Sequence, residues 1–254
     1  MNILISGTAG DIGLGASRIL KEWGIFKNLY GMDIKKEHSS KFLFKKCCRC
    51  PAAKDKSYIF WVKSFIEQHS IDLFIPTSEA EINLLNNLNL KKIGKALLLI
   101  NNKFTIKYSL DKYKTLFLLN KKGISVPKNG IVGKTSPLNF PVIVKPRYGR
   151  GSKNIRLVKN EKSYKVSSLG YVWQEYLLPA SQEYTCPVYS NNNERYTTLI
   201  MRRKMEGGRT VSGVIVENKY IESYINKIAR VIKLKGSINI QLRLTVNGPI
   251  LFEI

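Results

Sequence analysis

The stretch Phe140–Val158, which reads FPVIVKPRYGRGSKNIRLV, constrains the fold of this chain more than any other. An apolar run over Pro141–Val144 ends at Lys145, and a second run over Ile155–Val158 follows a turn of glycines and cations. Two β-runs joined by a short glycine-containing loop predict a hairpin. Because glycines let backbone N–H groups approach an anion closely, the loop and Lys145 could hold the phosphates of a nucleotide. The alternative is an ordinary surface hairpin with a basic tip, since short glycine-rich motifs have many false matches.

Length and composition indicate a globular protein. The chain has 254 residues, enough for one large domain or two moderate ones. Its hydrophobic content of 44% is ample for a packed core and excludes global disorder. No apolar run reaches the ~18 residues that a membrane span needs. The first residues lack the basic region and the long apolar region of a signal peptide. We therefore expect a cytoplasmic protein with no membrane partner.

The net charge of +24 comes from 42 Lys and Arg against 18 Asp and Glu. Such a balance favours anionic partners such as nucleotides, nucleic acids or acidic sugars. The basic residues are spread along the chain, and a lysine-rich proteome would give the same balance, so most are expected on solvated faces. Nucleic-acid binding is therefore a remote alternative, and an affinity that falls steeply with salt would identify it.

The four cysteines do not form a zinc-binding pattern. Cys47, Cys48 and Cys50 crowd together, and Cys186 is far away. A structural zinc site usually takes its ligands in two pairs, and only His38 could add to the first three cysteines. We expect free thiols.

The first third of the chain alternates strands and helices. Asn2–Ser6 predicts a strand, Gly7–Gly13 a glycine turn, and Leu29–Asp33 a second strand that ends in an acid. The helix between them, Leu14–Trp23, has apolar spacing through Ala16, Ile19, Leu20 and Trp23. Such a unit can bind a dinucleotide, with Asp33 on the ribose. The glycine pattern matches that fingerprint only loosely, which favours a tight strand–helix turn without a ligand.

The alternation continues to about residue 103. Tyr58–His69 predicts a helix with Phe60, Trp61, Phe65 and Ile66 on its apolar face. Residues 72–76 and 96–100 predict further strands, and Thr77 or Ser78 can cap the helix that lies between them. Residues 1–103 therefore predict a small open α/β domain.

A different organisation begins near Phe104. A helix opens at Asp111–Lys114 and ends at Lys121–Gly123, where cations and glycine are typical. Further strands are expected over 172–177, 183–189 and 196–204, followed by a loop over 206–210 and an amphipathic helix over 222–234. Residues 237–245 and 249–254 predict a hairpin around Asn247-Gly248.

Six motifs occur in an order that resembles the ATP-grasp superfamily. They are Asp111-Lys112, Val144-Lys145-Pro146 with its glycine loop, Gln174-Glu175-Tyr176-Leu177, Glu183-Tyr184-Thr185, Asn239-Ile240-Gln241 and Phe252-Glu253-Ile254. The sequence is most similar to short relatives of the carbamoyl-phosphate synthase large chain. The resemblance implies a Rossmann-like α/β domain over residues 1–103 and an α+β ATP-grasp domain over 104–254. The latter would consist of a small lid subdomain over 104–173 and a C-terminal subdomain over 174–254.

The resemblance also implies roles for single residues, with ATP and Mg²⁺ as ligands. Lys112 and Lys145 correspond to the cations that hold the ATP phosphates, and Glu183 to the acid that binds the ribose hydroxyls. The remaining assignments are Gly149, Arg150, Gly151 and Ser152 in a loop closing over the phosphates, Glu175, Tyr176 and Leu177 in an adenine-reading hinge, Gln241 and Glu253 as Mg²⁺ ligands, and Arg202, Arg203 and Arg209 at the transferred phosphoryl group.

The implied reaction is the ATP-driven activation of a carboxylate as an acyl-phosphate, followed by attack of an amine. The small carboxylate and amine substrates are not identified by the sequence. One departure from the family is that Glu253-Ile254 is not followed by the usual Asn and Pro-Arg. We therefore expect a C-terminally truncated chain, with three alternatives to an active ligase. These are a catalytically inactive nucleotide-binding protein, half of a split enzyme completed by another polypeptide, and the basic nucleic-acid-binding protein considered above. A second copy of the chain, in a homodimer, or a complementing polypeptide is the expected protein partner. A nicotinamide-dependent enzyme is a remote further option.

Overall fold

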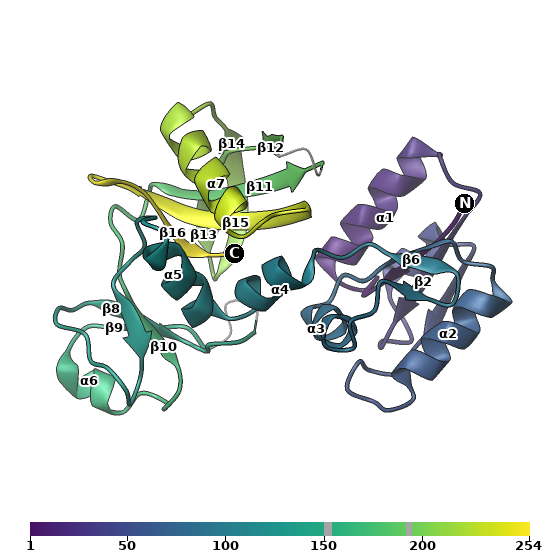
Figure 1. The fold of residues 1–254 in the computed structure, drawn as a ribbon, viewed down its shortest axis with the longest axis horizontal. Coiled ribbons are helices and arrows are strands. Elements are labelled where there is room, and N and C mark those ends of the chain that lie inside the picture. Colours follow the sequence, from purple (N-terminus) through teal and green to yellow (C-terminus); the bar gives the residue numbers. More distant parts are fainter. Residues whose placement is uncertain (150–153, 192–194) are drawn as a thin grey trace. The chain divides into compact units, whose positions relative to one another are not determined.

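The computed structural model describes residues 1–149, 154–191 and 195–254, with the exception of the Arg209 side chain. The chain divides into two compact units, Met1–Lys103 and Phe104–Ile254 (Figure 1). Among the described residues, none of the helices combines the length and the apolar character that a membrane span requires.

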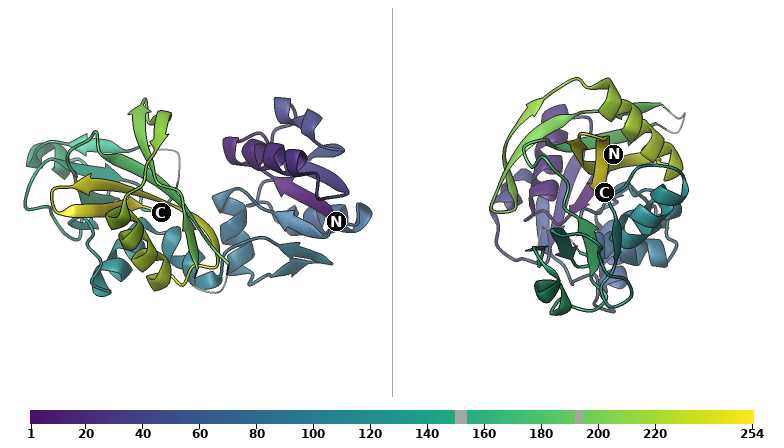
Figure 2. Two further views of the ribbon diagram at one scale, coloured as in Figure 1. Left: turned by 90° about the horizontal axis from the view of Figure 1, so that it is seen from above. Right: turned by 90° about the vertical axis from the view of Figure 1, so that its left-hand side faces the viewer.

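The first unit is built on one sheet with helices packed against it (Figures 1 and 2). The strand order of this sheet is β3-β2-β1-β4-β6-β5. Its strands run parallel, except that β5 is antiparallel to β6. The strands are β1 (Asn2–Ser6), β2 (Asn28–Asp33), β3 (Lys46–Arg49), β4 (Leu73–Ile75), β5 (Lys92–Ile93) and β6 (Ala96–Leu98), and the helices are α1 (Asp11–Trp23), α2 (Tyr58–Gln68), α3 (Glu79–Asn87) and the short 3-10 helix η1 (Ser39–Leu43). The open α/β organisation predicted from the sequence is confirmed.

The two faces of this sheet are covered unequally. Alternate residues of β1 point to opposite faces, so Leu4 packs with α2 and α3, whereas Ile3 and Ile5 pack with Leu20 of α1.

Ser78 caps α3 by accepting a hydrogen bond from the backbone N–H of Glu81, as the sequence predicts.

The predicted buried face of α1 is partly wrong: Ala16 and Leu20 are partly buried, but the other two residues of that face are not. Ile19 and Trp23 are 54% and 66% exposed, and the buried residues of the helix are Gly13 and Ser17. The reason is a close backbone approach: a Cβ on Gly13 would lie 2.4 Å from the carbonyl oxygen of Gly7. Only glycine fits there, so Gly13 and Ser17 face inward, Leu20 packs at the edge of the buried cluster, and Ile19 and Trp23 face outward.

The predicted face of α2 is partly wrong. Phe65 and Ile66 are buried as expected, but Phe60 is 76% exposed. Tyr58 and Val62 are buried instead. They lie one helical turn apart and on the same face as Phe65 and Ile66, so helical spacing decides which residues are buried.

The second unit contains two antiparallel sheets. The small sheet has the order β7-β10-β8-β9, and the large sheet has the order β14-β13-β11-β15-β16, with β12 paired to β11. Its elements are α4 (Lys103–Ser109), α5 (Lys112–Lys121), β7 (Asn129–Ile131), β8 (Val142–Lys145), β9 (Arg156–Val158), α6 (Glu161–Lys165), β10 (Val172–Glu175), β11 (Glu183–Ser190), β12 (Tyr196–Thr198), β13 (Met201–Glu206), β14 (Arg209–Ile215), α7 (Lys219–Val231), β15 (Gly236–Thr245) and β16 (Gly248–Glu253).

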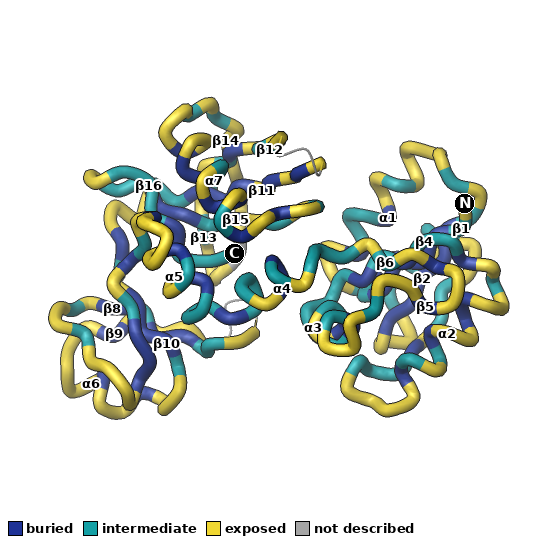
Figure 3. The backbone as a smooth tube through the Cα atoms, viewed as in Figure 1, coloured by how far each residue is buried: buried dark blue, intermediate teal, exposed yellow. Residues whose placement is uncertain are grey.

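The predicted hairpin is confirmed, because β8 and β9 pair in antiparallel register with Val142 opposite Val158. The strands of the small sheet are mostly buried, whereas α6 is mostly exposed (Figure 3).

Two expectations for the large sheet are wrong. The strand expected over 196–204 is divided into β12 and β13, and part of the expected loop belongs to β14. The chain reverses at Gly207 and Gly208, whose positive φ angles of 56° and 77° allow a tight turn between β13 and β14.

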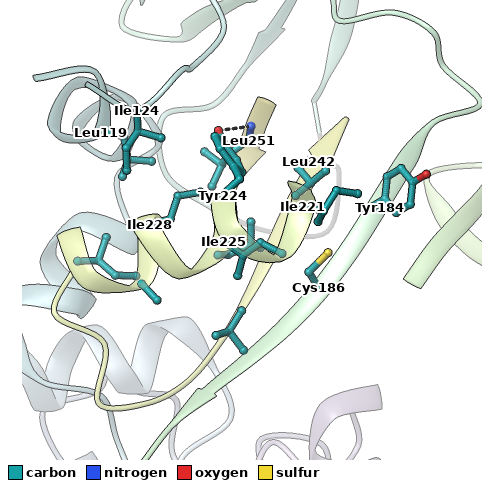
Figure 4. Close-up of a cluster of buried hydrophobic side chains, with 14 of the residues drawn as sticks. Leu119, Ile124, Tyr184, Cys186, Ile221, Tyr224, Ile225, Ile228, Leu242 and Leu251 are labelled. Atoms are coloured by element: carbon teal, nitrogen blue, oxygen red, sulfur yellow. Dashed lines mark hydrogen bonds between the residues drawn. The ribbon is translucent and has the colours of Figure 1, made fainter. Parts of the chain in front are cut away.

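The core of the large sheet lies under α7. Ile221, Tyr224, Ile225 and Ile228 follow helical spacing and pack with Leu242, Leu251 and other buried residues of this cluster (Figure 4). Asn218 caps the helix by accepting hydrogen bonds from the N–H groups of Tyr220 and Ile221. The amphipathic helix predicted over 222–234 is thus present, and it begins three residues earlier than expected.

Candidate functional site

The face of the large sheet opposite α7 carries charged and polar side chains. In β11, Tyr184 and Cys186 join the core, so Glu183 and Thr185 point to the other face. Register places Glu183 opposite Arg243 of β15, and Gln241 opposite Glu253 of β16. An alternating strand pattern therefore gathers ionic and amide groups on one surface, here called the polar face.

Two lysines from separate segments reach β16 at this face. Lys145, at the end of β8, donates from Nζ to the carbonyl oxygen of Phe252 over 2.9 Å. Lys112, at the start of α5, places Nζ 3.3 Å from Glu253 Oε1. Burial lowers the pKa of Lys145 to about 8; the charge of Glu253 opposes this effect and that of Lys112 adds to it. A bound anion would favour the charged lysine, so this pair is suited to hold phosphate.

One arginine joins two of the predicted ligand residues. Arg203 of β13 donates to Glu183 Oε1 from Nε at 3.1 Å and from Nη2 at 2.7 Å. The same Nη2 lies 3.0 Å from Gln241 Oε1. Arg203 therefore fixes Glu183 and Gln241 relative to each other.

The segment after β10 is tied to the polar face by Arg243. This side chain donates to the Leu177 carbonyl oxygen and to Glu183 Oε2. Its guanidinium carbon lies 5.4 Å from the centre of the Tyr176 ring. Glu175 itself is exposed and accepts a hydrogen bond from the N–H of Lys128 over 3.1 Å. Tyr176 and Leu177 thus lie beside Glu183, whereas the Glu175 carboxylate is held by Lys128.

The sequence assigned no role to Arg243 or to Gln174, although Gln174 opens one of the six motifs. Arg243 is 8% exposed, and Gln174 on β10 is 2% exposed. Within the described part of the chain, Gln174 Oε1 has no hydrogen-bond partner. Both residues interrupt apolar β-runs, VWQEYL and NIQLRL. A cation or an amide within a short strand that is otherwise rich in apolar residues is the signal that could have identified them.

Other predicted site residues are not brought to this face or lie outside the description. Arg202 is exposed, and its strand neighbour Arg203 occupies the polar face, so Arg202 points the other way. Gly149 lies close to the lysines, since its carbonyl oxygen accepts from Lys112 Nζ over 2.5 Å. Arg150, Gly151 and Ser152 and the side chain of Arg209 fall outside the described residues.

Gln241 and Glu253, which are paired on adjacent strands, each offer an oxygen atom that could ligate a metal ion. The described residues contain no group of three or more His, Cys, Asp or Glu arranged to hold a metal ion. Mg²⁺ binds oxygen, takes few ligands from protein, and completes its shell with phosphate and water. The donor set therefore fits an Mg²⁺ ion bound together with a nucleotide.

The glycine turn of the first unit, Gly7–Gly13, is held by hydrogen bonds to the carboxylate of Asp33. Asp33 Oδ2 accepts from the N–H of Ala9 and Oδ1 from the N–H of Lys35, each over 2.8 Å. Asp33 is 6% exposed, and both carboxylate oxygens already have partners. This arrangement favours the interpretation that the turn is structural and does not bind a dinucleotide.

A comparison with known proteins identifies a family that matches more than half of the chain. The family model of the ATP-grasp domain matches residues 109–254. A coenzyme gamma-F420-2:alpha-L-glutamate ligase from Methanococcus maripaludis is 26% identical over 139 residues, which cover 51% of this chain and 48% of that protein. The chain thus spans about half the length of the curated relative it matches.

Solved structures share the fold over nearly the whole chain. An L-amino acid ligase from Bacillus licheniformis matches 99% of this chain and 66% of its own, with a TM-score of 0.74 and 15% identity. An N5-carboxyaminoimidazole synthetase from Staphylococcus aureus, complexed with ADP, matches 99% of this chain and 69% of its own, with a TM-score of 0.77 and 17% identity. The fold class predicted from the sequence is confirmed.

Proposed function

Since the chain belongs to the ATP-grasp domain family, we propose that it is an ATP-dependent ligase that activates a carboxylate for attack by an amine. The observation that carries this proposal is the meeting of Lys112 and Lys145 with Glu253 and its neighbour Phe252 on β16. These groups combine cations for phosphate with oxygen ligands for a metal ion. The ATP-grasp resemblance seen in the sequence is confirmed by the family match.

The proposed reaction has two steps. A carboxylate oxygen of the substrate attacks the γ-phosphorus of ATP, the bond to the β-phosphate oxygen breaks, and ADP leaves. The amine nitrogen then attacks the acyl carbon of the acyl-phosphate, inorganic phosphate leaves, and the nitrogen loses a proton. Such chemistry depends on positioning and on charge stabilisation more than on covalent participation of the protein. Lys112, Lys145 and Arg203 supply fixed positive charge for it.

Mg²⁺ would be held by Gln241 and Glu253. When bound, the ion neutralises charge on the phosphates. In the present arrangement Glu253 pairs with Lys112, and Gln241 accepts from Arg203. Both oxygens are therefore held on the polar face by cations, next to the lysines proposed to bind phosphate.

The adenosine end would bind beside Arg243. Glu183 is proposed for the ribose hydroxyls and the Glu175–Leu177 segment for the adenine. The buried Oε1 of Gln174 without a partner supports this location, because the adenine amino group is a donor that could satisfy it. Residues 1–103 are proposed as the domain that precedes an ATP-grasp module, 104–173 as a lid subdomain and 174–254 as the C-terminal subdomain.

An amino acid is the proposed substrate class. Support comes from two similar proteins, which are named an L-amino acid ligase and a glutamate ligase. A cytoplasmic location, a homodimer and a complementing polypeptide stay predictions.

Hydroxylamine trapping tests the reaction. The protein is incubated with ATP, Mg²⁺, a panel of amino acids and hydroxylamine, and ADP and hydroxamate are measured. We expect ADP release that requires a carboxylate and is lost in Lys145→Met but retained in Lys165→Met, a change at an exposed lysine of α6. Nucleotide binding without carboxylate-dependent ADP release across the panel would instead support an inactive nucleotide-binding protein.

A further inference from the structure

Asp111 is a buried carboxylate at the start of α5, directly before Lys112. It is 2% exposed and caps the helix, since Oδ1 accepts from the N–H of Lys114 over 3.1 Å. We infer that Asp111 is a positioning residue that sets the two phosphate-binding lysines relative to each other. This inference rests on the proposed function of Lys112 and Lys145.

Asp111 is bound to the segment that follows β8. Arg147 Nε donates to Asp111 Oδ1 and Arg147 Nη2 to Oδ2, both over 2.8 Å, in a two-pronged ion pair. The hydroxyl of Tyr148 donates to Oδ2 over 3.0 Å. In return, the carbonyl oxygen of Arg147 accepts from the N–H of Lys112 over 3.2 Å. These bonds join residues 111–112 to residues 147–148 through both side chains and backbone.

The Asp111–Arg147 ion pair limits the movement of both lysines. Lys112 follows Asp111 directly, and Lys145 precedes Arg147 by two residues, so neither lysine can shift far while the ion pair holds. Lys112 is also held by its hydrogen bond to the carbonyl oxygen of Gly149. The two ammonium groups then reach neighbouring positions on β16, at Glu253 and at the carbonyl oxygen of Phe252.

Charge explains why such a link is needed. Lys114 and Arg147 both lie beside Asp111, and the charge of Lys112 acts on Lys145, so like charges repel on both sides of this carboxylate. Burial alone would raise the pKa of Asp111, but hydrogen bonds from Arg147, the N–H of Lys114 and Tyr148 hold that pKa below its ordinary value. Asp111 therefore stays ionised and compensates the cations beside it. A bidentate arginine–carboxylate pair also fixes direction, which a flexible lysine contact does not.

Affinities for ATP, ADP and adenosine, measured by calorimetry, separate positioning from a merely structural role. Asp111→Asn keeps a side-chain oxygen that can cap α5 but removes the charge. Arg147→Met removes the other half of the pair without touching the cap. We expect each change to weaken ATP and ADP by about tenfold or more, equivalent to about 1.4 kcal/mol, while adenosine affinity stays within about twofold.

The two changes should not add, because they break one interaction; the double variant should bind ATP about as well as each single variant. The matched control is Lys114→Met, since Lys114 Nζ lies 3.7 Å from Asp111 Oδ2 but is 44% exposed. It should leave all three affinities unchanged.

Three outcomes would overturn the inference. ATP affinity unchanged in both single variants would exclude positioning by Asp111. A parallel loss of adenosine affinity would show a general structural effect. Additive losses in the double variant would show that Asp111 and Arg147 act separately. Failure of the folded wild-type protein to bind ATP is distinct from these, because it refutes the proposed function together with this inference.

Discussion

Lys145 Nζ and the carbonyl oxygen of Phe252 lie 2.9 Å apart, in a site where the lysine is almost completely buried. A buried ammonium group usually has a carboxylate as its direct partner. Here the direct partner is a neutral carbonyl group, and the carboxylate of Glu253 pairs with Lys112. A charged Lys145 in this position therefore lowers the stability of the protein without nucleotide, and bound phosphate would stabilise the same charge.

The first prediction concerns stability and pH. Burial, with the nearby charge of Lys112, lowers the pKa of Lys145 from 10.5 to about 8. Between these two values the unfolded chain binds more protons than the folded one, so the free energy of unfolding rises with pH across this window. Below it, the destabilisation from charged Lys145 is fully present and amounts to about 3 kcal/mol at most.

Lys145→Met removes this titration. Urea unfolding without nucleotide should show that the variant is at least as stable as wild type near neutral pH. Between neutral pH and about pH 10, the free energy of unfolding of wild type should rise relative to that of the variant. A variant clearly less stable than wild type at neutral pH, with no change in the difference at higher pH, would contradict the account.

The second prediction concerns Arg243. Arg243→Met removes a donor from the Leu177 carbonyl oxygen and a partner from Glu183. Because Glu183 is largely buried and keeps Arg203 as its one charged partner among the described residues, the expected loss is about 2–4 kcal/mol in the free energy of unfolding, with weaker adenosine binding. Arg202→Met is the matched control; Arg202 is exposed, so its loss should stay within about 0.5 kcal/mol. Equal stability of the two variants in urea unfolding would refute the role given to Arg243.

The third prediction concerns the core under α7. Tyr224 OH donates to the carbonyl oxygen of Ser125 over 2.6 Å and accepts from the N–H of Leu251 over 2.8 Å. Tyr224→Phe leaves both backbone groups without this partner and should cost about 1–3 kcal/mol in thermal or urea unfolding. ATP affinity should not change, because Tyr224 lies on the opposite side of the sheet from the polar face. Tyr220→Phe, at a residue 81% exposed on the same helix, should have no effect. A loss as large in Tyr220→Phe would show that the hydrogen bonds of Tyr224 are not responsible.

Local sequence signals predicted the elements that depend on them. The α7 helix follows from apolar residues at helical spacing, and the β15–β16 hairpin follows from Asn247-Gly248. The buried faces of α1 and α2 could not be predicted from apolar residues alone. Close contact at Gly13 turns small residues of α1 inward, an effect that depends on a backbone distance absent from the sequence pattern.

The candidate site was only partly predictable. The motifs marked Lys112, Lys145, Glu183, Gln241 and Glu253, and the structure gathers them near β16 and the polar face. Arg203 was assigned to the transferred phosphoryl group, and its contacts with Glu183 and Gln241 were not predicted. The contacts of Arg243 and Asp111 could not be predicted either, because they join distant segments of the chain. A cation within an apolar strand indicates burial with a partner, but it does not identify the partner.

The most direct test of the account is the titration of ATP into the protein by calorimetry, with and without Mg²⁺, for wild type, Lys145→Met and Lys165→Met. We expect that wild type and Lys165→Met bind ATP, that Mg²⁺ tightens binding, and that Lys145→Met loses most of the affinity. Near pH 8, binding to wild type should also take up protons, since phosphate raises the pKa of Lys145. A folded wild-type protein that does not bind ATP, or a Lys145→Met variant that binds it equally well, would contradict the assignment of this site.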